Sequence, residues 1–158
     1  MILDPEWVIL GWNMKIIAVC ASVSFYQDLF AIEKRLKELG FKPVLPVTAR
    51  RMKRKGSFDV ESQKTWYKNP SDYHIKTALI KGHFKEIEKA DAVLIVNNKK
   101  REMIGYIGGN TLMEMTIAFY LRKKIYILNS ISDELSFAEE VYGMNPIFLN
   151  GDLGKIKK

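Results

Sequence analysis

Residues 91–129 read DAVLIVNNKKREMIGYIGGNTLMEMTIAFYLRKKIYILN, and this stretch decides the fold. The apolar run 91–97 predicts a strand, the polar segment after it predicts a loop, and a helical pattern opens within 106–115. A second apolar run, 124–128, predicts the next strand. A strand, a crossover helix and a strand form a parallel βαβ unit, whose ligand sites lie at the carboxyl ends of the strands and at the helix N-terminus. We therefore expect any chemistry near residues 108–114.

Glu114 is the unusual residue of the predicted helix. Ala118 and Leu121 follow it at i+4 and i+7, so a carboxylate begins an apolar stripe that should pack on the sheet. In a structural interpretation, Glu114 interacts with the helix dipole, worth about 0.3–1 kcal/mol, while Asn110 caps the backbone N–H groups. In a functional one, the dipole keeps an ionised carboxylate in the crevice as a nucleophile or base. Spacing alone favours the structural interpretation.

Length and composition predict one globular domain. The chain has 158 residues, 47% of them hydrophobic, which suits a single core. It contains no run near the roughly 18 apolar residues that a membrane span needs, and residues 1–13 lack the features of a secretory signal. We therefore expect a cytoplasmic protein with no membrane partner.

The single cysteine excludes some kinds of site, and the net charge suggests the sign of the partner's charge. Cys20 is the single cysteine, so the sequence excludes an intramolecular disulfide and a cysteine-based zinc site, and it predicts a buried structural thiol. We expect no metal and no cofactor. The net charge of +7 suggests an anionic partner, either a phosphorylated small molecule or nucleic acid, without choosing between them.

The first predicted unit runs from residue 14 to Gly40. Residues 14–21 predict a strand, and the helix after it ends with Gly40 at the C′ position. Ser22 or Ser24 would lie at the head of this helix, where it could bind a phosphate or a ribose hydroxyl, or serve as an ordinary N-cap. The predicted domain spans 14–154.

Residues 1–13 form an N-terminal extension of uncertain origin that carries Trp7 and Trp12. Exposed tryptophans would more plausibly dock on the domain or on a second subunit than bind a ligand. We therefore expect a homo-oligomer.

The segment 41–73 predicts a strand and then a long connection. Pro43 and Pro46 place the strand 41–47 at or near a sheet edge. Residues 48–73 show no clear period; they carry a basic cluster at 50–55, with Trp66 and Tyr67 further on. They could form a mobile cover over a nucleotide or a solvated basic loop.

The rest of the chain completes an alternating pattern. Residues 74–89 predict a helix with His83 near its end, where a lone histidine more often packs or caps than catalyses. Residues 132–142 predict another helix and 146–149 a last strand. The alternation predicts the α/β class, with a single doubly wound parallel sheet of about five strands.

In this order, the segments 90–97, 106–115 and 123–129 resemble the nucleoside 2-deoxyribosyltransferase superfamily. The resemblance implies a flavodoxin-like Rossmannoid fold. It also implies cleavage or transfer at the N-glycosidic bond of a deoxynucleoside or deoxynucleoside 5′-monophosphate through a glutamate nucleophile. A small-molecule nucleoside or nucleotide is therefore the expected partner.

The resemblance also assigns roles to residues. The family's glycine-rich helix start followed by glutamate falls on Gly108, Gly109 and Glu114, which implies that Glu114 is the nucleophile. Where the family usually has an aspartate as acid/base, this chain has His83, whose ordinary pKa near 6.5 suits proton donation near neutrality. The predicted substrate-binding residues are Ser22, Ser24, Gly108, Gly109, Asn110 and Asn98.

Alternatives remain beside this assignment. Residues 108–114 also resemble the Gly-Gly-x-Gly-Thr-x-x-Glu loop of phosphoribohydrolases labelled lysine decarboxylase-like, but they lack the preceding proline and the glycine before the threonine. The chain could instead be a catalytically inactive Rossmannoid nucleotide-binding module. A nucleic-acid-binding protein is a third hypothesis, ranked below the others.

Overall fold

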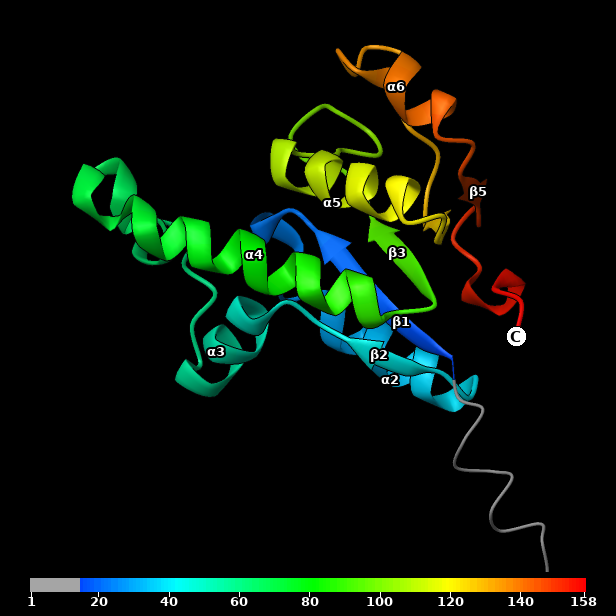
Figure 1. The fold of residues 1–158 in the computed structure, drawn as a ribbon, viewed down its shortest axis with the longest axis horizontal. Helices are drawn as coiled ribbons and strands as arrows, with labels where there is room; N and C mark the ends of the chain where they lie inside the picture. The colour runs from blue at the N-terminus through cyan, green and yellow to red at the C-terminus, as the bar shows by residue number, and fades with distance from the viewer. Residues whose placement is uncertain (1–14) are drawn as a thin grey trace, which may run out of the picture.

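Five parallel strands form one sheet in the computed structural model, which describes residues 15–158 (Figure 1). The strands are β1 (Ile16–Ala21), β2 (Lys42–Val44), β3 (Ala92–Val96), β4 (Lys124–Ile127) and β5 (Ile147–Phe148), in the order β2-β1-β3-β4-β5. This is the strand order of flavodoxin-like doubly wound folds. The predicted α/β class and the edge position of β2 are confirmed.

Helices cover both faces of this sheet. They are α2 (Leu29–Glu38), α3 (Val47–Lys55), α4 (Tyr73–Lys89), α5 (Gly109–Tyr120) and α6 (Ala138–Gly143). Short 3-10 turns are η1 (Val23–Phe25), η2 (Glu61–Gln63), η3 (Thr65–Tyr67), η4 (Pro70–Asp72) and η5 (Leu153–Lys155). Helices α4 and α5 pack side by side over β1 and β3 (Figure 1).

The alternation of side chains along β1 builds two cores. Ile17 and Val19 point to the core that α2 and the C-terminal segment close, whereas Ala18 and Cys20 point to the core under α4, α5 and α6. Because β1 and β3 are central, almost all of their residues are buried. Such continuous apolar strands are typical of a parallel sheet covered on both faces.

Two sequence predictions about helices are wrong in part. Residues 48–55, expected within an irregular connection, form α3 together with Val47, which was expected to end a strand. Thr48, Ala49 and Met52 of this helix are buried. This narrow apolar stripe lies among lysines and arginines, which hid its helical period. In the segment 132–142, only the part from Ala138 onward is helical. The helix 74–89 and the end of α2 at Gly40, where φ is +85°, match the predictions.

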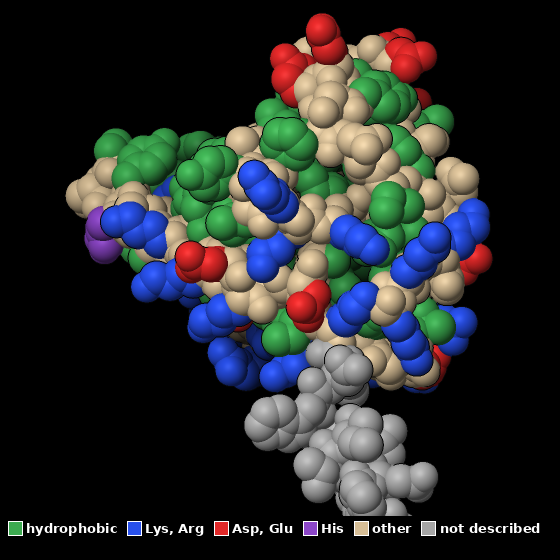
Figure 2. Space-filling model, turned by 45° about the vertical axis from the view of Figure 1, so that its right-hand side comes forward, with side chains coloured by type: hydrophobic (Ala, Val, Ile, Leu, Met, Phe, Trp, Pro, Cys, Tyr) green, Lys and Arg blue, Asp and Glu red, His purple; other side chains and the backbone are tan. Residues whose placement is uncertain are grey.

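The surface is basic but mixed. On the face shown in Figure 2, lysine and arginine side chains are spread over the lower part and are interrupted by apolar and acidic groups. Within residues 15–158, no helix has the length and apolarity that a membrane span requires. The predicted extension with Trp7 and Trp12 lies outside the described residues.

Candidate active site

A cavity of about 820 Å³ opens at the carboxyl ends of β1 and β2, between α3, α4 and the start of α5. Most of the predicted site residues line it: Ser22, His83, Gly108, Gly109, Asn110 and Glu114. Two do not. Ser24 is exposed outside the lining, and the amide of Asn98 donates a hydrogen bond to Asp28 at 3.0 Å.

Packing of α4 against α5 brings His83 and Glu114 together. His83 lies one turn before Ile87, and Glu114 lies one turn before Ala118; Ile87 and Ala118 are both fully buried against the sheet. The two polar side chains therefore face each other where the core under α4 and α5 meets the cavity. His83 Nδ1 lies 2.6 Å from Glu114 Oε1, and the side chains are only 11% and 13% exposed.

The direction of this hydrogen bond follows from chemistry. An ionised carboxylate can only accept, so His83 Nδ1–H donates to Glu114. Burial lowers the pKa of His83, but the hydrogen bond and the negative charge of Glu114 outweigh burial, so the pKa is raised above its ordinary value. The protonated form of His83 therefore persists to higher pH than that of a free histidine.

The other two polar atoms of this pair are free. His83 Nε2 and Glu114 Oε2 are buried, and neither has a hydrogen-bond partner among residues 15–158. Buried polar atoms are nearly always paired with protein or with ordered water, so an unpaired one that lines a cavity is positioned to bind a ligand or a water. Each side chain of the pair is held by one atom and has a second atom available to a ligand.

Cys20 lies beside the pair, which the sequence did not predict. One ligand atom from each of Cys20, His83 and Glu114 lies within 4.8 Å of the others. Burial, and then the carboxylate of Glu114, raise the pKa of the Cys20 thiol well above its ordinary value, so it is a neutral thiol. The predicted burial is confirmed. The sequence argument counted cysteines alone and could not detect a cluster that also uses a histidine and a glutamate.

Aromatic and cationic side chains form the walls of the cavity. Trp66 is buried and lies under the Lys76 ammonium at 5.5 Å, while Lys100 lies 4.5 Å from the centre of the Tyr106 ring. Burial, and then the charge of Lys64, lower the pKa of Lys76. A partly desolvated cation close to a second cation attracts an anionic ligand. Lys76, Lys64 and Tyr106 had no local signal in the sequence.

Tyr26 also lines the cavity. Burial raises the pKa of its phenol, and the charge of Glu114 raises it further. Tyr26 therefore presents a neutral hydroxyl near the carboxylate.

The basic cluster 50–55 makes contacts within the protein. Of its cations, Arg50 lines the cavity, and its guanidinium donates to Glu33 at 2.7 Å. Arg50 and Lys37 hold the pKa of Glu33 below its usual value, although burial acts in the opposite direction. Arg51 donates to Gln63 at 3.2 Å. These contacts give the cluster a structural role in joining α2, α3 and the following connection.

The start of α5 differs from the expected capping. Its N-cap is Gly108, with no side-chain cap, so Asn110 lies within the first turn and does not cap the helix. Glu114 lies beyond the first turn, where the helix dipole acts weakly, so the structural interpretation of this acid is wrong. Without a capping side chain, the first backbone N–H groups of α5 can bind an anion.

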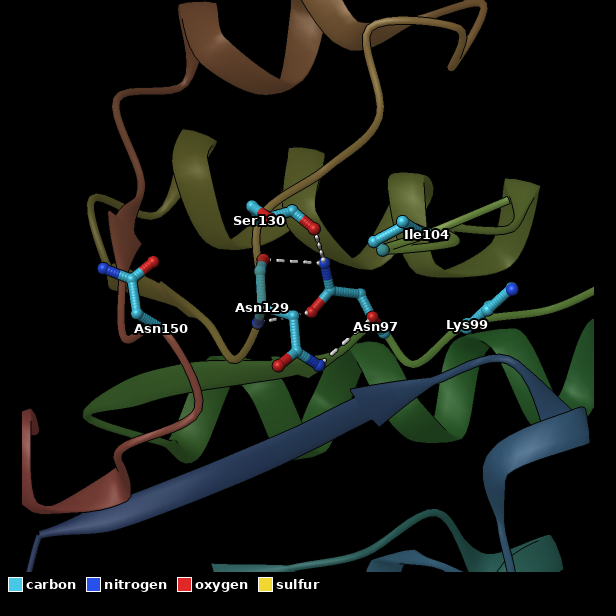
Figure 3. A pocket seen from close by; sticks show the side chains of 7 residues that line it. Asn97, Lys99, Ile104, Asn129, Ser130 and Asn150 are labelled. Carbon is cyan, nitrogen blue, oxygen red and sulfur yellow. Dashed lines mark hydrogen bonds between the residues drawn. The ribbon is translucent and has the colours of Figure 1, made fainter. Parts of the chain in front are cut away.

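A second hollow, of about 490 Å³, lies at the carboxyl ends of β3 and β4 (Figure 3). Asn97 is fully buried there; its amide donates to the carbonyl groups of Asn129 and Ser130, and its Oδ1 accepts from the Asn129 N–H at 2.9 Å. Gly105, at φ +64°, packs so closely that a Cβ would collide with the Ser130 carbonyl oxygen. The polar groups of Asn97 are satisfied within the protein. The Asn97 side chain therefore holds the ends of β3 and β4 together, which is a structural role.

Comparison with known proteins identifies the fold. No protein-family model matches the chain, and no curated protein matches it in sequence. Among solved structures, the 2-deoxyribosyltransferase of the psychrotolerant bacterium Bacillus psychrosaccharolyticus matches with a TM-score of 0.57 and 13% identity, over 90% of this chain and 92% of that one. The chain has the fold of that enzyme. A CMP N-glycosidase of Clostridium botulinum also matches, with a TM-score of 0.47 and 14% identity, over 86% and 89% of the two chains.

Proposed function

We propose that this chain cleaves or transfers the N-glycosidic bond of a nucleoside or nucleotide, with Glu114 as the nucleophile. The observation that carries the proposal is the state of the Glu114 carboxylate: Oε1 accepts from His83 at 2.6 Å, whereas Oε2 is unpaired in a cavity of nucleotide size. The fold shared with a 2-deoxyribosyltransferase agrees with this chemistry.

The bond changes follow from this arrangement. Glu114 Oε2 attacks the anomeric carbon of the sugar, the bond from that carbon to the base nitrogen breaks, and its electron pair leaves with the base. The product is a glycosyl ester on Glu114. Water then cleaves the ester in a hydrolase, whereas a second base cleaves it in a transferase.

His83 acts on both the attacking carboxylate and the departing base. Its Nδ1–H orients the carboxylate, and the raised pKa of His83 favours a second proton on Nε2. That proton passes to the departing base, which is a better leaving group when protonated. A histidine can thus replace the aspartate that the family usually has.

The cations of the cavity favour a 5′-phosphate over a free nucleoside. Lys76 and Lys64 lie close together on the wall without an ion-pair partner among residues 15–158. Ser22 and the open N-terminus of α5 add neutral donors. The aromatic rings of Trp66 and Tyr106 offer surfaces on which a base can stack.

A panel of deoxynucleosides and their 5′-monophosphates, analysed for free base, tests the proposal. We expect base release from at least one deoxynucleoside 5′-monophosphate, and an added second base distinguishes transfer from hydrolysis. Intact-mass spectrometry after rapid quenching should detect a glycosyl adduct, which peptide mapping should locate at Glu114. Nucleotides that raise the melting temperature but release no base would instead indicate a binding module.

A further inference from the structure

The cluster of Cys20, His83 and Glu114 has a chemistry that the proposed reaction does not use. Cys20 reaches it from β1, His83 from α4 and Glu114 from α5, and one ligand atom of each lies within 4.8 Å of the others. An independent feature points to a ligand at this position, because His83 Nε2 and Glu114 Oε2 are buried and unpaired. A thiol, an imidazole and a carboxylate thus converge on one point at the edge of the cavity.

We propose that Cys20, His83 and Glu114 form a binding site for a zinc ion. Sulfur, nitrogen and oxygen donors together suit Zn²⁺, whereas Mg²⁺ and Ca²⁺ take oxygen ligands. In a tetrahedral zinc site with bonds of about 2.0–2.3 Å, ligand atoms lie about 3.5 Å apart, so the cluster has to contract by about 1 Å. Three protein ligands leave a fourth position on the side of the cavity.

Zinc binding releases two protons, and the cavity gives the ion a route to the site. Zinc takes Cys20 as the thiolate and His83 through the unpaired Nε2, so the thiol proton and the Nε2 proton leave to the solvent, while Nδ1–H stays hydrogen-bonded to Glu114 Oε1. His83 and Glu114 line the cavity, and Cys20 is fully buried behind them. The ion therefore enters through the cavity and meets the histidine and the glutamate first.

Zinc binding opposes the function proposed above. An ion on Glu114 engages the attacking carboxylate, and an ion on His83 removes the proton that the leaving base requires. Zinc is therefore an inhibitor that competes with substrate. The inhibition rests on the proposed function, whereas the binding itself does not.

Direct titration of the full chain tests the binding. Zinc is added to metal-free protein in competition with a chromophoric chelator, for the wild type, Cys20→Ser, Cys20→Ala and His74→Ala. We expect one ion per chain, and binding at least about 10–100-fold weaker in both Cys20 variants, since losing a ligand costs at least as much as losing a group that supports one. His74, the other histidine, is exposed on α4 and is the matched control.

Cobalt supplies a test that needs no variant. Co²⁺ bound to a cysteine thiolate gives a charge-transfer band in the near ultraviolet, which the wild type should show and Mg²⁺ should not produce. A wild type without this band, or zinc affinity unchanged by Cys20→Ala, would overturn the site. A chain that binds zinc but releases no base would keep the site and overturn the proposed function. If base is released, zinc should suppress it and a chelator should restore it, equally in His74→Ala.

Discussion

The main cavity and the hollow at β3 and β4 lie at the same edge of the sheet, yet they differ in the state of their polar atoms. In the hollow, the amide of Asn97 makes hydrogen bonds through both its nitrogen and its oxygen. In the cavity, His83 and Glu114 each have a buried polar atom without a partner. A satisfied network holds the fold, whereas unpaired buried atoms cost stability that a bound ligand or water restores, and so they are available for chemistry.

Loss of the proposed nucleophile should have the largest effect. Glu114→Gln keeps the size of the side chain but removes the negative charge, and we expect base release to fall on the order of 10⁴-fold or more, with the glycosyl adduct absent. The measurement is free base by chromatography beside circular dichroism of the folded variant. Turnover that survives in both Glu114→Gln and Glu114→Ala would refute the mechanism.

Loss of the proposed acid should have a smaller effect. His83→Ala should slow base release by about 10²–10⁴-fold, most for bases that leave poorly, because these depend most on the donated proton. Single-turnover rates over a series of bases measure this dependence. His74→Ala, on the same helix but exposed, should match the wild type. An equal loss for all bases would contradict the role as acid.

Loss of the Lys76 cation, which lies partly buried on the cavity wall, should change the choice of substrate. Lys76→Gln should weaken binding of a deoxynucleoside 5′-monophosphate by about 10–100-fold and leave the nucleoside unaffected, since a hydrogen bond to a charged group is worth about 1.5–3 kcal/mol. Affinities from calorimetry on Glu114→Gln avoid turnover during the experiment. If Glu114→Gln with Lys76 intact bound the nucleoside and its 5′-monophosphate equally well, the proposed preference for a 5′-phosphate would be wrong.

In the hollow at β3 and β4, a substitution should affect stability and not activity. Asn97→Ala should lower the free energy of unfolding by about 1–3 kcal/mol, because it leaves the Asn129 N–H and the Ser130 carbonyl without their partner. Base release per folded molecule should stay at the wild-type level. Urea unfolding measures the loss of stability, and base release measured on the same samples gives the activity per folded molecule. An activity loss without a stability loss would indicate that the hollow belongs to the site.

The smallest expected effect is the pH dependence of stability. Since the pKa of His83 is raised in the fold, its contribution is fully present below the ordinary value near 6.5 and is lost as pH rises through the folded value. Relative to His83→Gln, the wild type should lose at most about 1.4 kcal/mol per pH unit in that window. Urea unfolding across neutral pH measures it. A difference that stays constant above pH 6.5 would contradict the raised pKa.

Local sequence patterns predicted most of the fold. Two prolines placed β2 at the edge because proline cannot complete a central ladder, and Gly40 ended α2 because it tolerates a positive φ. The apolar runs of β1 and β3 indicated a parallel sheet buried on both faces. Helix α3 was missed because Ala49 and Met52 form a stripe too narrow to stand out among charged neighbours.

By itself, the sequence determined most elements of the fold and, through a family resemblance, singled out Glu114 and His83. Tertiary structure alone decided that these side chains meet, because they are 31 residues apart on two helices whose packing no local period encodes. It also placed Cys20 beside them, since alternation along β1 selects a face of the sheet but not the helix that covers it. Whether a polar atom is paired depends on every neighbour that folding brings to it, and so the distinction between cavity and hollow exists only in three dimensions.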